Sequence, residues 1–131
     1  KTSVIHCPGS HAYFGHQDFS LSQLNKLGVT IGIGTDSLAS NDSLNFLNEI
    51  KQFSQNYPEL SKEEILKMAT MNGAQILGLE KQIGSLEKGK KADLAVFNLE
   101  GNQSPIESIF KANCVSHLFI NGNLLSQFNG I

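Results

Sequence analysis

The sequence predicts an α/β fold with parallel strands in its first 80 residues, followed by a mainly β region. Apolar, strand-like runs alternate with segments of helical period up to Leu79, the order expected of βα units. Residues 29–34 (VTIGIG) are apolar on both faces, as in strands of parallel sheets that are covered on both sides. After Leu79 the pattern changes to short strands, a charged turn and a hairpin dipeptide. We therefore expect a boundary near residue 80.

The first elements are a strand, a loop, a helix and a second strand. Residues 2–7 form a β-rich run that ends at a Pro-Gly turn signal, and residues 9–16, which lack a clean period, are predicted to be a loop. Apolar residues at helical spacing, stopped by a glycine, then predict a helix: Phe19, Leu21, Leu24, Leu27 and Gly28. Residues 29–34 form the second strand.

Two further helices are predicted before residue 80. The first has an N-cap at Asp42 or Ser43, a stop at Pro58, and apolar residues at helical spacing: Leu44, Leu47, Ile50 and Phe53. The second begins with the capping box of residues 61–64 (SKEE) and pauses near residues 72–73.

Beyond residue 80 we expect only strands and turns. Residues 92–99 and 114–120 are each predicted to be a strand, with a loop at residues 101–105 between them. The Asn-Gly pair at 121–122 is a hairpin dipeptide, so the leucines at 124–125 would begin the return strand.

Composition excludes several classes of protein. The chain has 131 residues, 40% of them hydrophobic, which is enough for one domain with a core. A net charge of −2 argues against a nucleic-acid partner, and no apolar run approaches the roughly 18 residues of a membrane span. Two cysteines, Cys7 and Cys114, predict a reducing compartment, the cytoplasm, rather than a disulfide scaffold. Because a strand follows directly on Lys1, we expect a piece of a longer protein.

Asp36 is the sharpest candidate for chemistry. It directly follows the two-sided apolar strand, and the carboxyl ends of parallel strands are where α/β enzymes place catalytic groups. A carboxylate there can bind a metal or take a proton from a metal-bound water. The alternative, on position alone, is that Asp36 only caps the following helix. Gly32 and Gly34 favour chemistry slightly, because they allow close backbone approach.

Three of the four histidines, His6, His11 and His16, fall five residues apart. Together with Cys7 they would have to converge to bind zinc, but their spacing matches no usual structural zinc pattern. His6 is predicted to be either a pocket residue or a buried histidine, while His11 and His16 either contact substrate or are solvated. A Cys7–His6 nucleophile pair is disfavoured, because adjacent strand residues point to opposite faces.

Four motifs in one order carry a family resemblance: HCPGSH, GVTIGIGTDSLASNDSL, MATMNGAQILGL and IGSLEKGKKADLAVFNL. Together they resemble the C-terminal part of the metal-dependent amidohydrolases, in the branch of nucleoside and triazine deaminases and chlorohydrolases. Within that branch, residues 9–16 (GSHAYFGH) resemble the aminodeoxyfutalosine deaminases.

The resemblance implies an α/β fold that is a C-terminal fragment of a (β/α)8 barrel, with β-strands of a small composite β-sandwich domain. Residues 1–80 would hold the last two barrel strands and their helices, and residues 81–131 the C-terminal strands of the sandwich. It also implies one divalent metal, zinc or alternatively iron. Asp36 would bind this metal and act as general base. The residues implied to contact substrate are His6, Ser10, His11 and Ser37.

The departures from the family pattern limit what the chain does alone. The family's other metal ligands include an HxH pair, which this sequence lacks. A (β/α)8 barrel also needs about 250 residues. We therefore expect the remaining ligands in a missing N-terminal part, its main partner, and an inactive chain without it; a homodimer is also possible in this family.

The expected reaction of the complete enzyme is hydrolysis of a carbon–nitrogen bond other than a peptide bond. The expected substrate is a small purine-nucleoside-like molecule of the aminodeoxyfutalosine or adenosine type, which would lose its amine. Three alternatives stay open: a chlorohydrolase, a non-catalytic binding module that reuses half a barrel, and a small independent zinc protein that uses the three clustered histidines.

Overall fold

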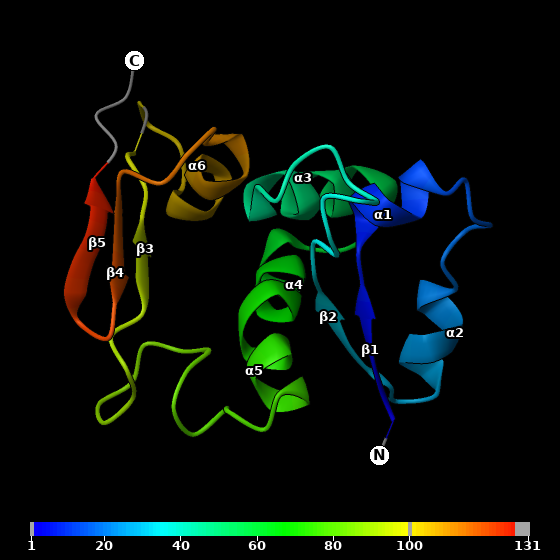
Figure 1. Cartoon of the computed structure of the whole chain (residues 1–131), viewed down its shortest axis with the longest axis horizontal. Coiled ribbons are helices and arrows are strands. Elements are labelled where there is room, and N and C mark those ends of the chain that lie inside the picture. The colour runs from blue at the N-terminus through cyan, green and yellow to red at the C-terminus, as the bar shows by residue number, and fades with distance from the viewer. Residues whose placement is uncertain (1, 100, 128–131) are drawn as a thin grey trace.

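Two small sheets with helices between and around them make up this mixed α/β chain (Figure 1). The computed structural model describes residues 2–99 and 101–127. Strands β1 (Ser3–His6) and β2 (Thr30–Ile33) pair in parallel, with His6 opposite Ile33. Helices α1 (Pro8–Tyr13) and α2 (Leu21–Lys26) lie in the connection between the two strands. The predicted parallel pairing and the helix before Gly28 are therefore confirmed.

Helix α1 occupies the segment that the sequence predicted to be a loop, so that prediction was wrong. The proline of the Pro-Gly signal stands at the first helical position, where its missing N–H costs nothing and its fixed φ favours the helix. The backbone N–H of His11 donates to the carbonyl of Cys7 at 2.9 Å. With six residues, the helix is too short to show a hydrophobic period.

Four helical segments follow β2: α3 (Phe46–Asn56), α4 (Lys62–Lys67), a π-helical turn (Met68–Asn72) and α5 (Gly73–Ile76). The N-cap of α3 is Asn45, whose side chain accepts from the backbone N–H of Leu47 at 3.1 Å, so the predicted caps at 42 and 43 were wrong. The capping box of Ser61 and Glu64 is confirmed.

The predicted pause near residue 72 is a continuous helical path that widens into the π turn. Asn72 uses this turn to reach the first sheet: its Nδ2 donates to the carbonyl of Ile31 at 2.7 Å. This hydrogen bond fixes the π-helical turn to β2, the strand that leads to Asp36.

The second sheet is antiparallel, in the order β3-β4-β5, from β3 (Leu94–Val96), β4 (His117–Ile120) and β5 (Asn123–Gln127). Asn121 and Gly122 join β4 to β5 with φ values of 51° and 79°, the left-handed pair that a tight hairpin requires, so the hairpin is confirmed. Strands β3 and β4 are shorter than predicted. Helix α6 (Pro105–Lys111) lies between them in sequence and was not predicted.

The hydrophobic core lies between β2, helix α2 before it and the helices that follow it. Its buried members are Leu21, Ile31, Ile33, Ile50, Phe53, Ile65, Met68 and Phe110. Phe110 comes from α6, which lies beside α3 in Figure 1. Lys62 of α4 also joins α6, through an ion pair with Glu107 at 2.7 Å. Helix α6 therefore packs onto the core of the first 80 residues although it follows residue 80 in sequence.

Within the described residues, no helix combines the length and the apolar character that crossing a membrane requires.

Candidate functional site

Asp36 lies three residues beyond the end of β2, on an exposed loop, with a φ of 57° in the left-handed region. Aspartate tolerates this conformation better than most residues. The hydroxyl groups of Ser10 and Ser40 both donate to its Oδ2, at 2.7 and 2.8 Å. The hydrogen bond from Ser10, and then that from Ser40, lower the pKa of the Asp36 carboxyl. The carboxylate is thus anionic and oriented near neutral pH.

The helix-capping alternative for Asp36 is wrong. The next helix, α3, begins at Phe46, and Asn45 caps it. Asp36 instead receives its hydrogen bonds from side chains on α1 and on its own loop, which is an arrangement suited to a ligand or a base.

His6 is a buried histidine at the end of β1. Its ring stacks on Phe19 with centroids 4.1 Å apart and meets Phe53 edge-on at 5.7 Å. Burial, with a smaller contribution from His11, lowers the pKa of His6 to about 4. The ring is therefore neutral at physiological pH and is held by aromatic packing.

The three clustered histidines form a chain of ring contacts. His11 lies 5.0 Å from His6 and 5.5 Å from His16, centroid to centroid. Nε2 of His11 lies 2.8 Å from the carbonyl oxygen of Gln17. Within the part of the chain that the structure describes, no group of three or more His, Cys, Asp or Glu side chains is placed to hold a metal ion. The rings meet edge-on or at a tilt, in succession along the segment, and this arrangement does not favour the independent zinc protein.

Cys7 directly follows β1 and is the N-cap residue of α1. A Cβ added at Gly34 would lie 3.2 Å from its Sγ, whereas His6 packs against Phe19 and Phe53. Burial raises the pKa of the Cys7 thiol, which keeps it protonated. A protonated thiol does not favour the Cys7–His6 nucleophile pair, although both residues line one cavity.

A cavity of about 270 Å³ collects most of the predicted substrate contacts. Its lining residues are Ile5, His6, Cys7, Ser10, His11, His16 and Phe19. Ser10 joins this cavity to Asp36 through its hydroxyl. Ser37 is not among the lining residues; its Oγ accepts from the backbone N–H of Ala39 at 3.3 Å and helps to turn the loop after Asp36.

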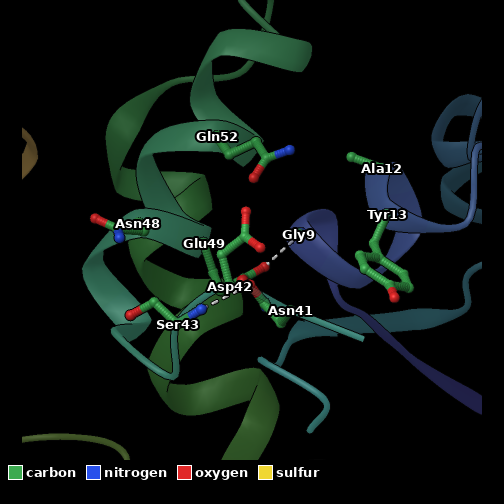
Figure 2. Close-up of a pocket in the computed structure, with 9 residues that line it drawn as sticks. All are labelled: Gly9, Ala12, Tyr13, Asn41, Asp42, Ser43, Asn48, Glu49 and Gln52. Atoms are coloured by element: carbon green, nitrogen blue, oxygen red, sulfur yellow. Dashed lines mark hydrogen bonds between the residues drawn. The ribbon is translucent and has the colours of Figure 1, made fainter. Parts of the chain in front are cut away.

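A buried carboxylate, Glu49 of α3, was missed by the sequence analysis (Figure 2). Its side chain is 2% exposed and accepts from the backbone N–H of Gly9 at 2.9 Å and from Asn41 Nδ2 at 2.6 Å. The signal was present, because Glu49 stands four residues before Phe53 on the apolar face of an amphipathic helix.

Comparison with known proteins places this geometry in context. The model of the amidohydrolase family matches residues 1–125. A 5-methylthioadenosine/S-adenosylhomocysteine deaminase of Pyrococcus furiosus is 38% identical over an alignment that covers 95% of this chain and 33% of that protein. An S-triazine hydrolase of Gordonia rubripertincta is 32% identical over 92% of this chain and 28% of that protein.

Solved structures of deaminases are also similar to this chain over nearly its whole length. An adenosine deaminase of Xanthomonas campestris with bound zinc superposes with a TM-score of 0.84 at 28% identity, over 93% of this chain and 31% of that one. An aminofutalosine deaminase of Helicobacter pylori superposes with a TM-score of 0.81 at 29% identity, over 95% and 32%. The chain thus spans about a third of the length of the relatives that it matches.

Proposed function

We propose that this chain, which belongs to the amidohydrolase family, supplies the last part of a metal-dependent enzyme that hydrolyses carbon–nitrogen bonds other than peptide bonds. The substrate class is a purine-nucleoside-like molecule that loses an exocyclic amine. One observation carries the proposal: an exposed carboxylate, Asp36, follows a parallel strand and is oriented by two serine hydroxyls. The deaminases among its relatives support the choice of substrate class.

Residues 1–80 act, in this proposal, as the last two strands and helices of a (β/α)8 barrel, and residues 81–131 as strands of a small β-sandwich. The parallel pairing of β1 with β2 supports the first part, and the separate antiparallel sheet supports the second. Ile5 of β1 is 44% exposed, as expected of a barrel-lining residue whose other neighbours lie outside this chain. The main partner is therefore the rest of the same enzyme.

A divalent metal, zinc by preference, fits the residues that are present. Asp36 offers an anionic oxygen ligand at a strand end, and carboxylate oxygens are ordinary zinc ligands. The remaining ligands would come from outside this chain. When bound, such an ion supplies Lewis-acid chemistry and lowers the pKa of water.

The side chains of this chain divide the remaining work. Asp36 accepts a proton from the attacking water and later returns it to the departing amine, so it ends each cycle as it began. Ser10 and Ser40 keep its carboxylate in one orientation. His6 and His11 line the neighbouring cavity, where the neutral ring of His6 presents an aromatic wall to a heterocyclic substrate.

The direct test replaces Asp36 in the complete enzyme. Asp36→Asn should lower kcat by about 10²–10⁴-fold, the usual contribution of a positioned acid–base group, without lowering Tm comparably. Asp42→Asn is the matched control, because this exposed aspartate lies on the same loop and should keep normal turnover. Full activity of the Asp36→Asn enzyme would remove the assignment and favour a non-catalytic binding module.

A chlorohydrolase is the second candidate, since one relative is an S-triazine hydrolase. The two reactions release different products, so ammonia and chloride are measured side by side on adenosine-type and chlorotriazine substrates. Ammonia release that Asp36→Asn abolishes supports the deaminase. Chloride release with the same dependence would assign the site to the second reaction.

A further inference from the structure

We propose that Glu49 is a positioning residue for Asp36: it fastens the two segments that supply the hydroxyl donors to the Asp36 carboxylate. The inference rests on the proposed function, in which Asp36 is the reacting group of this chain. Glu49 itself lies on α3. Its hydrogen bonds go to Gly9 and Asn41, not to Asp36, and it does not line the cavity beside Asp36, so it acts on Asp36 through Gly9 and Asn41.

Glu49 joins two segments that are far apart in sequence. One carboxylate oxygen accepts from the backbone N–H of Gly9, in the first turn of α1, and the other accepts from Asn41, in the loop after β2. Figure 2 shows both hydrogen-bond partners converging on this side chain. With the side chain 2% exposed, both hydrogen bonds are shielded from competing water.

Both segments continue directly to Asp36. The residue after Gly9 is Ser10, whose hydroxyl donates to Oδ2 of Asp36 at 2.7 Å. The residue before Asn41 is Ser40, whose hydroxyl donates to the same oxygen at 2.8 Å. The amide of Asn41 also donates to the carbonyl of the residue before Asp36, at 2.9 Å. Two connections thus lead from Glu49 to the Asp36 carboxylate, and a third leads to the backbone beside it.

The chemistry of this position favours a carboxylate over its neutral isostere. Both groups that meet Glu49 are N–H donors, so a glutamine would turn its own NH₂ toward one of them. Among the described residues Glu49 has no salt-bridge partner, so burying it is costly unless both hydrogen bonds form. A Cβ at Gly9 would lie 2.6 Å from Glu49 Oε1 and from Asn41 Nδ2, so the segments meet without spare room.

The conformation of Asp36 explains why such bracing matters. Its φ of 57° is a sparsely populated conformation for a residue with a side chain, and it persists only where the surroundings hold it. The exposed loop offers little packing for this purpose, because Ser37, Leu38 and Ala39 are all exposed. The hydrogen bonds that reach back to Glu49 supply the restraint instead.

The test measures Glu49→Gln in the complete, zinc-loaded enzyme. Outer contacts of a metal site usually change affinity or activity by about 10–100-fold, so we expect kcat or zinc affinity to fall by at least about tenfold, with KM within about twofold. Zinc affinity is measured by chelator competition, a readout independent of turnover. Ile65→Val, in the core but away from the loop, is the control for a general loss of stability.

Each outcome has one meaning. A Glu49→Gln enzyme that keeps both kcat and zinc affinity within about twofold of the parent overturns the inference. If that variant does not fold, half-buried Asn41 is replaced instead: Asn41→Ala breaks the same connection from the loop side and is judged by the same criteria. Loss of activity in Asp36→Asn with none in these variants removes the positioning role alone, whereas activity retained in Asp36→Asn removes the proposed function.

Discussion

The two sheets of this chain differ in how they are buried. In the parallel pair, strand β2 is packed from within the chain: Ile31 and Ile33 are 1% and 6% exposed beneath the helices that follow. The antiparallel sheet keeps large apolar side chains exposed, with Ile120 at 48% and Leu125 at 66%. In Figure 1 the two sheets lie at opposite sides of α4 and α5.

The difference indicates which region of this chain buries its apolar side chains without other protein. The candidate site is attached to the parallel pair, and its hydrogen bonds join α1, the loop after β2 and α3 around one core. Helix α6, which lies between β3 and β4 in sequence, carries Phe110 into that core. Such an apolar sheet surface is typical of a region that is completed by other protein.

The largest expected effect is the loss of unfolding free energy when a phenylalanine in each region is replaced by alanine. Phe53 is fully buried, so Phe53→Ala should lower the free energy of unfolding by about 3–5 kcal/mol through lost burial and a cavity. Phe119, in β4, is only half-buried, and Phe119→Ala should cost about 1–2 kcal/mol. Denaturant unfolding of the complete protein measures both. Equal costs would break the comparison and show that the sheet is as fully buried there as the core.

The next effect is the pH dependence of stability, compared between the buried His6 and His117 of the antiparallel sheet. The pKa of His6 falls from 6.5 to about 4 on folding, so the unfolded chain binds its proton first as pH drops. The stability that the neutral ring contributes is present above pH 6.5 and is lost as pH falls toward 4. Tm should therefore decline between pH 6.5 and about 5, above the main range of carboxyl titration.

His6→Phe keeps an aromatic ring against Phe19 and should flatten that decline. The matched control in the antiparallel sheet, His117→Phe, should leave the decline in place. A Tm profile that is unchanged in the His6→Phe protein would contradict the assignment of the pH dependence to this buried ring.

The smallest effect compares two helix caps. Ser61 accepts from the N–H of Glu64 in a reciprocal capping box, so Ser61→Ala should cost about 1 kcal/mol. Ser104 accepts from the backbone N–H of Glu107 over a longer 3.4 Å, and the Glu107 carboxylate pairs with Lys62 instead of completing a capping box, so Ser104→Ala on α6 should cost less. Unfolding free energies of both variants test the order, and a larger cost for Ser104→Ala would reverse it.

Much of the fold was predictable because it depends on local patterns. The apolar strand before Asp36, the capping box at Ser61 and the Asn-Gly hairpin were each identified from neighbouring residues, and each is present. Helices α1 and α6 were missed because six and seven residues are too few to show a helical period. Both begin with a proline at the first helical position, which was the overlooked signal.

The sequence by itself determined the parallel strands, the helices between residues 21 and 76, the hairpin, the family, and Asp36 as the residue to examine. Only the tertiary structure decided which side chains meet it. Ser10 reaches Asp36 across 26 residues of sequence, and Gly9 reaches Glu49 across 40. Hydrophobic periods and caps extend over a few residues, so they carry no information about such contacts. These depend on how the strands and helices pack, and the packing turned a polar residue on an apolar helix face into a brace for the candidate site.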